Sequence, residues 1–135
     1  MARILVIDDE PLVREIFGII LKRAGHEVVI AANGSEAVAI HRDQPAHLVV
    51  TDILMPEMDG LETIEELRLR SPGLKIIAIS GGSKICNVDL LSLATKYGAS
   101  AVLRKPVENA ELVQSVVSCL GSTEVENVIP LQQSR

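Results

Sequence analysis

Short apolar segments and amphipathic segments alternate along this chain up to about residue 120. The apolar segments are mostly β-branched and nearly continuous, which is the pattern of strands buried on both faces of a sheet. The amphipathic segments carry apolar residues at helical spacing. The pattern predicts strands at residues 3–7, 27–31, 47–51, 75–80 and 101–104, and helices at residues 11–24, 34–42, 60–70, 88–97 and 109–120.

Residues that begin or end helices agree with these boundaries. Pro11 suits a first helical turn, where its missing N–H costs nothing. Gly25 and Gly98 follow predicted helices at the position where a left-handed C-terminal cap is favoured. Strands that alternate with helices predict a doubly wound α/β fold, with a five-stranded parallel sheet and helices on both faces. The last helix carries an apolar stripe that we expect to face the sheet, formed by Leu112, Val113, Val116, Val117 and Leu120.

Charged residues stand directly after three of the predicted strands. Asp8 and Asp9 follow the first strand, Asp52 follows the third and Lys105 follows the fifth. If these strands are parallel neighbours, the charged groups converge at one end of the sheet. Three carboxylates so close repel one another and shift one another's pKa unless a cation lies between them. The arrangement points to a divalent metal and phosphoryl chemistry.

The composition narrows the range of functions. The length of 135 residues fits one domain, and 47% apolar residues suffice for a core. A net charge of −5 argues against a nucleic-acid backbone as partner. No apolar run is long enough for a transmembrane helix and no signal peptide is evident, so we expect a cytoplasmic protein without a membrane partner. Residues 121–135 lose the periodicity and are expected to form a polar, flexible tail after a domain over residues 1–120.

Four short motifs in this order carry a family resemblance. They are IDDE at residues 7–10, TDILMPEMDG at 51–60, IS at 79–80 and RKP at 104–106. Over residues 2–120 the chain resembles the receiver domain of two-component response regulators. The resemblance implies a flavodoxin-like (βα)5 fold with strand order 2-1-3-4-5, in which the first and third strands flank the ligand-binding end.

The resemblance also implies roles for the acidic residues. Asp52 corresponds to the phospho-acceptor, whose carboxylate attacks a phosphoryl donor and forms an aspartyl phosphate. Asp9 corresponds to a direct Mg²⁺ ligand and Asp8 to the holder of a metal-bound water. Asp52 and the backbone carbonyl of Leu54 complete the protein's share of the metal site.

Two further residues have counterparts in the family's site. Lys105 corresponds to the lysine that pairs with the phosphoryl oxygens, and the family's Lys–Pro bond, here Lys105–Pro106, is cis. Ser80 corresponds to the hydroxyl residue that binds a phosphoryl oxygen and draws the following loop inward.

The chain departs from the family pattern in the part that transmits the signal. Val102 occupies the position where the family often has an aromatic switch residue. The stretch from Ser80 to Lys105 is longer than usual and begins with Gly81-Gly82-Ser83. Leu54 and Gly82 supply no polar side chain that would orient an attacking water. We therefore expect slow hydrolysis of the phosphorylated protein when it is alone.

The expected function is a phosphorelay receiver that catalyses its own aspartyl phosphorylation and dephosphorylation. Its partners are expected to be a sensor histidine kinase or a histidine phosphotransfer protein and a downstream protein target; a phosphorylation-dependent homodimer is left open. The apolar helix 11–24, with Val13 and Ile16, is the expected docking face for the kinase or phosphotransfer helix. The alternatives are a Mg²⁺-dependent phosphatase or phosphotransferase with an aspartate nucleophile, and a receiver fragment of a larger regulator. We assign no chemistry to His26, His41 and His47, and expect Cys86 and Cys119 to be reduced thiols.

Overall fold

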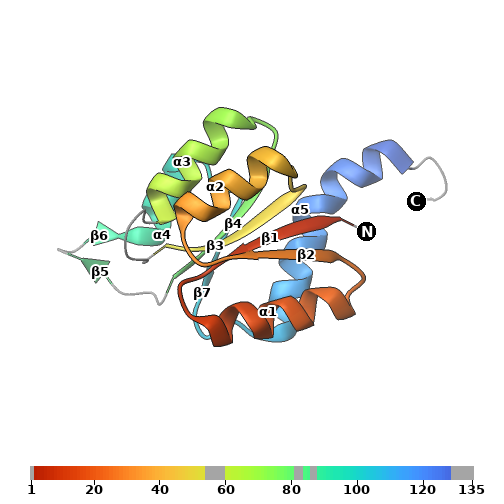
Figure 1. Ribbon diagram of the computed structural model, residues 1–135, viewed down its shortest axis with the longest axis horizontal. Coiled ribbons are helices and arrows are strands. Elements are labelled where there is room, and N and C mark those ends of the chain that lie inside the picture. The colour runs from red at the N-terminus through yellow and green to blue at the C-terminus, as the bar shows by residue number, and fades with distance from the viewer. Residues whose placement is uncertain (1, 54–59, 81–83, 86–87, 129–135) are drawn as a thin grey trace.

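The computed structural model describes residues 2–53, 60–80, 84–85 and 88–128. Its centre is a five-stranded parallel sheet with the order β2-β1-β3-β4-β7, which confirms the predicted fold and strand order (Figure 1). Four strands have the predicted bounds, and β3 is shifted by one residue at each end. The strands are β1 (Arg3–Ile7), β2 (Glu27–Ala31), β3 (Leu48–Asp52), β4 (Lys75–Ser80) and β7 (Ala101–Arg104).

Helices cover both faces of this sheet. On one face α2 (Gly34–Asp43), α3 (Gly60–Arg70) and α4 (Leu90–Tyr97) pack over a core that includes Val49 and Ile76. On the other face α1 (Pro11–Arg23) and α5 (Asn109–Val128) pack over a second core (Figure 1). The two cores explain why the strands are continuously apolar, because both sides of each central strand are buried.

Two short strands replace the start of a predicted helix. The helix predicted at 88–97 begins at Leu90, because Val88–Asp89 forms β6 and pairs antiparallel with β5 (Lys84–Ile85). Ile85 and Val88 are β-branched, a residue type that favours extended backbone. The prediction of helix at residues 88–89 was therefore wrong.

The last helix also differs from the prediction. Helix α5 continues past Leu120 to Val128, since the single Gly121 costs only about 1 kcal/mol and no proline lies between Leu120 and Pro130. The predicted polar tail is thus helical over 121–128, and residues 129–135 lie outside the described ranges. In the predicted stripe Leu112 and Val116 are fully buried, whereas Val117 is 52% exposed and does not face the sheet.

The helix ends follow the predicted chemistry. Gly25 and Gly98 have positive φ angles of 98° and 123°, the left-handed conformation that favours glycine at a helix C-terminus. Pro11 is the first residue of α1. These caps return the chain to the next strand and so set where each strand begins.

All three histidines lie near the amino-terminal end of the sheet and accept backbone N–H groups through Nδ1. His26 accepts from Ala2 at 3.2 Å and His47 accepts from Arg3 at 2.9 Å. His41 accepts from the backbone N–H of Ala46 at 3.0 Å, and its Nε2 lies 2.9 Å from the hydroxyl of Ser71. Burial lowers the pKa of His41. These bonds give all three imidazoles a structural role at the end opposite the carboxylates.

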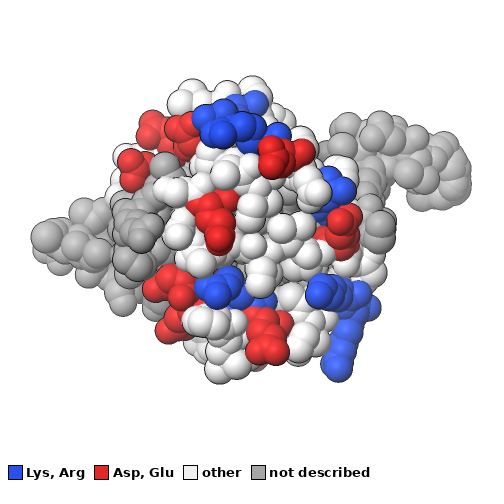
Figure 2. All heavy atoms as spheres, viewed as in Figure 1, with Lys and Arg blue, Asp and Glu red and all other residues white. Residues whose placement is uncertain are grey.

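The surface carries charges of both signs. On the face drawn in Figure 2, acidic and basic side chains of the described residues are interspersed and form no broad basic area. Within the described ranges, no helix combines the length and the apolar character needed to cross a bilayer.

Candidate functional site

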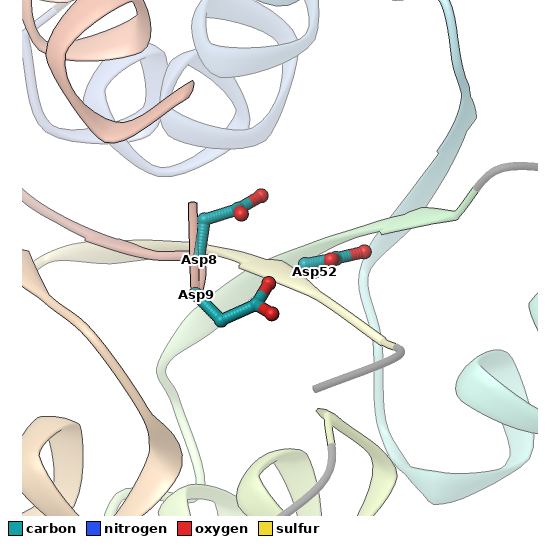
Figure 3. A group of neighbouring side chains, drawn as sticks. All are labelled: Asp8, Asp9 and Asp52. Atoms are coloured by element: carbon teal, nitrogen blue, oxygen red, sulfur yellow. The ribbon is translucent and has the colours of Figure 1, made fainter. Parts of the chain in front are cut away.

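The register of the central strands brings the predicted acidic residues together. Ile7 in β1 is paired with Thr51 in β3, so Asp8 and Asp52 leave neighbouring strands side by side. Asp52 is the last residue of β3 (Leu48–Asp52), whereas the sequence predicted it directly after a strand at 47–51. One carboxylate oxygen from each of Asp8, Asp9 and Asp52 lies within 4.8 Å of the other two (Figure 3). The convergence expected from the sequence is therefore present.

Lys105 lies beside this cluster. Its Nζ is 3.6 Å from Oδ2 of Asp52 and 3.9 Å from Oδ2 of Asp8. The backbone N–H of Lys105 donates to the carbonyl of Ser80 at 2.7 Å, which joins the ends of β7 and β4. The Lys105–Pro106 peptide bond is cis, as the resemblance implied. One cation thus faces two of the three carboxylates.

Burial dominates the electrostatics of the two inner carboxylates. Asp52 is 7% exposed, and burial raises its pKa from 3.8 to about 6, although the nearby Lys105 acts in the opposite direction. Burial likewise raises the pKa of Asp8, against the effects of a hydrogen bond from the backbone of Glu10 and of Lys105. The cluster holds more negative charge than Lys105 alone compensates, and it is therefore suited to bind a further cation.

The cluster fits a hard divalent cation. It offers carboxylate oxygens from two neighbouring strand ends, and oxygen is the ligand that Mg²⁺ prefers in proteins. Asp9 is exposed, so the cluster is accessible to solvent on one side. Leu54, whose carbonyl was expected to complete the metal site, lies outside the described residues.

Two other predicted residues are placed by the structure. Ser80 is the last residue of β4 and is 1% exposed, next to the strand end that carries Lys105. Val102 lies in β7, paired with Ala78, and is 37% exposed. Residues 81–83, which depart from the family pattern, lie outside the described ranges. Ser80 is thus at the site. Val102 lies two positions before Arg104, the residue that is paired with Ser80.

Gly60 supports the site in a way that the sequence did not predict. Its N–H donates to the carbonyl of Ile53 at 2.7 Å. A Cβ at this position would lie 2.3 Å from the carbonyl oxygen of Asp52 and 2.4 Å from Cα of Ile53. Only glycine allows the start of α3 to approach the end of β3 this closely. The sequence pattern predicted the start of a helix at Gly60 but not this contact.

Arg14 is a second residue near the site that the sequence did not indicate. From the first turns of α1, its Nη1 donates to the backbone carbonyl of Asp8 at 2.7 Å. The carboxylate of Asp8 in turn accepts the backbone N–H of Glu10 at 2.9 Å. A lone arginine in a helix carries no pattern that marks such a contact.

An apolar groove lies between α1 and the segment that follows β7. Lys105 is among its lining residues, and Ile16, also in the lining, is 44% exposed. Leu12, one turn earlier in the helix, is 65% exposed. The apolar residues expected to form a docking face are thus partly on the surface. The groove is lined by Glu10, Val13, Ile16, Phe17, Lys105, Pro106 and Val107.

Comparisons with known proteins agree with the fold and identify the family. The sequence model of the response regulator receiver domain matches residues 4–117. The chain is 32% identical over 125 residues to the probable transcriptional regulatory protein TcrX of Mycobacterium tuberculosis, which covers 93% of this chain and 52% of that protein. It is 30% identical to the transcriptional regulatory protein GlrR of Escherichia coli, over 88% of this chain and 26% of that protein. The chain therefore spans between about a quarter and a half of these relatives.

Solved structures give the same result for the whole domain. The CheY-like receiver domain protein of Methanospirillum hungatei superposes with a TM-score of 0.85 at 31% identity, covering 93% of this chain and 98% of that one. A receiver domain protein of Clostridium thermocellum superposes with a TM-score of 0.84 at 29% identity, covering 93% and 99%. Since the family model spans most of the chain and the strand order agrees, this chain belongs to the receiver domains of two-component response regulators.

Proposed function

We propose that Asp52 accepts a phosphoryl group from a phosphohistidine of a partner protein. The observation that carries this proposal is the convergence of Asp8, Asp9 and Asp52 within 4.8 Å, with Nζ of Lys105 at 3.6 Å from Asp52. A nucleophilic carboxylate, two further carboxylates for a cation and one fixed ammonium are the groups that phosphoryl transfer to an aspartate needs.

The transfer is a substitution at phosphorus. An Oδ of Asp52 forms the new O–P bond while the N–P bond of the phosphohistidine breaks, and the leaving imidazole keeps the electron pair and takes up a proton from solvent. Asp52 needs no separate base, because a carboxylate attacks in its ionised form. Lys105, whose Nζ lies within 4 Å of Asp52 and Asp8, would pair with the phosphoryl oxygens; this short distance supports the role.

Asp8 and Asp9, together with Asp52, would hold Mg²⁺ at this site. When bound, the ion supplies positive charge that offsets the charge of the phosphoryl oxygens. Asp8 is buried and fixed by its bond from Glu10, whereas Asp9 is exposed. In this proposal the exposed Asp9 would be the direct ligand, and the buried Asp8 would hold a metal-bound water.

We further propose that the partner's phosphohistidine-bearing helix docks on α1 and the groove beside it. The exposed apolar side chains of Leu12 and Ile16 and the groove that Lys105 helps to line support this surface, because Lys105 also contacts the acidic cluster. The output is proposed to be a change of protein contacts, with Ser80 at the site as the residue that senses the phosphoryl group. The interspersed charges on the face drawn in Figure 2 and the net charge of −5 support a protein target over a nucleic acid.

Phosphorylation with a small phosphodonor tests the chemistry. The wild type and Asp52→Asn are incubated with phosphoramidate and Mg²⁺, and the intact mass and oligomeric state are measured. We expect one phosphoryl group on the wild type and none on the variant. Labelling of the variant to the same extent would refute the assignment of Asp52. Continuous turnover of small phosphate esters by the wild type would instead support the phosphatase alternative.

A further inference from the structure

We propose that Arg14 is a positioning residue for the metal site, acting through the backbone of Asp8. This inference rests on the proposed function, in which Asp8 and Asp9 hold Mg²⁺. Arg14 Nη1 donates to the carbonyl oxygen of Asp8 at 2.7 Å, and the contact is partly buried. Arg14 itself is held in place because it lies in the first turns of α1, where its N–H donates to the carbonyl of Glu10 at 3.1 Å.

The bond from Arg14 fixes the peptide unit between the two acidic residues. The carbonyl of Asp8 belongs to the Asp8–Asp9 peptide plane, and a planar peptide orients both residues that it joins. The N–H of Asp8 donates to Ala31 at 3.3 Å and its carboxylate accepts from Glu10 at 2.9 Å. Because the guanidinium of Arg14 donates to the carbonyl of Asp8, the N–H, the carbonyl and the carboxylate of Asp8 are all hydrogen-bonded.

The peptide plane matters most for Asp9. Its side chain is exposed, so packing restrains it little, and the direction in which it leaves the chain depends on the preceding peptide. In Figure 3 the Asp9 carboxylate points toward the carboxylates of Asp8 and Asp52 from the turn after β1. A guanidinium that holds this turn therefore keeps the carboxylates in one cluster before a cation binds. Groups that orient metal ligands in this way commonly change metal affinity when they are removed.

The charge of Arg14 has the opposite effect. A guanidinium next to the cluster repels a cation, so removal of its charge alone would strengthen Mg²⁺ binding. Loss of positioning would weaken it. The sign of the change in affinity thus separates the two effects.

Calorimetric titration with Mg²⁺ tests the inference. The wild type, Arg14→Ala, Arg14→Lys and Arg23→Ala are compared at pH 7.5, at a temperature where circular dichroism shows each to be folded. Arg23, in the last turn of α1, is the matched control because its removal takes away one positive charge from the same helix. We expect the Kd for Mg²⁺ to rise roughly 10-fold in Arg14→Ala, to rise less in Arg14→Lys, and to change less than about 2-fold in Arg23→Ala.

The outcomes against the inference are distinct. A Kd that is unchanged or lower in Arg14→Ala, or that rises equally in Arg23→Ala, would overturn it. If Arg14→Ala does not fold, Arg14→Lys decides the matter: an unchanged Kd overturns the positioning role, and a weaker one supports it. A wild type that binds no Mg²⁺ would refute the proposed metal site itself.

Discussion

Replacement of Asp52 by asparagine should stabilise the folded protein near neutral pH. The carboxylate is buried, and its pKa rises from 3.8 to about 6 on folding. Each pKa unit corresponds to about 1.4 kcal/mol, so the ionised carboxylate costs the folded state up to about 3 kcal/mol. Asparagine keeps the shape without the charge. Because its amide is still buried, about 3 kcal/mol is an upper limit for the gain.

The pH dependence follows from the direction of this shift. Between pH 4 and 6 the folded state binds a proton at Asp52 that the unfolded state has already released, so this residue's contribution to stability falls as pH rises. Above about pH 6 the carboxylate is ionised in both states and the full cost is present. Below about pH 4 it is protonated in both states and the cost disappears. The advantage of Asp52→Asn should therefore be full at pH 7.5 and close to zero at pH 4.

Urea denaturation in EDTA measures this difference. Far-UV circular dichroism is the suitable signal, because the chain has no tryptophan and one tyrosine. Asp43→Asn, at an exposed carboxylate in the last turn of α2, serves as the control and should change the free energy of unfolding little at either pH. A variant no more stable than the wild type at pH 7.5, or an advantage that persists at pH 4, would show that the burial of this charge does not destabilise the fold as argued. Added Mg²⁺ should stabilise the wild type more than the variant.

Further predictions follow from other contacts. Gly60→Ala should lower the free energy of unfolding, measured by urea denaturation, by at least about 2 kcal/mol, since its Cβ would overlap the backbone at Asp52–Ile53. Gly73→Ala, where a Cβ meets nothing within 4 Å, is the control and should change it little. His41→Asn should lower the free energy of unfolding by about 1–3 kcal/mol at pH 7.5, because two hydrogen bonds of the imidazole are lost. This difference from the wild type should narrow toward pH 5, since burial lowers the pKa of His41 and destabilises the wild type once pH falls below the ordinary histidine pKa. A difference that stays constant with pH would contradict this. Ile16→Asp should slow phosphotransfer from a partner kinase without loss of folding, while Ile19→Asp, exposed on the same helix but outside the groove at Lys105, should not; equal rates in both would argue against the docking face. The phosphorylated protein should persist for minutes or longer with Mg²⁺ present, as seen by mass, and a half-life of seconds would refute this.

The sequence was sufficient for the sheet and for the cluster of carboxylates. Continuous β-branched runs bounded by polar residues have few alternatives, so the strand at Lys75–Ser80 was predicted with its observed bounds. The helix start at residue 88 was wrong because a short segment of apolar residues suits either helix or strand, and pairing with Lys84–Ile85 decided it.

The supporting contacts of the site were beyond the sequence for a different reason. The contact of Gly60 with the Asp52–Ile53 backbone depends on how α3 is set against β3, which no local pattern encodes. The bond from Arg14 to Asp8 depends equally on the angle of α1 to the sheet. Residue types predicted the groups that carry charge, whereas three-dimensional packing determined the groups that hold them.

The histidines give the domain a chemical asymmetry along its strands. Because Nδ1 of each imidazole accepts a backbone N–H, each neutral ring must carry its proton on Nε2, and nitrogen NMR should report one tautomer for His26, His41 and His47. Mild acid therefore acts in opposite directions at the two ends of the sheet. Protonation of Asp52 and Asp8 relieves the repulsion within the carboxylate cluster, whereas protonation of His41 removes the Nδ1 acceptor of the Ala46 N–H, so acidification should loosen the turn before β3 at the other end.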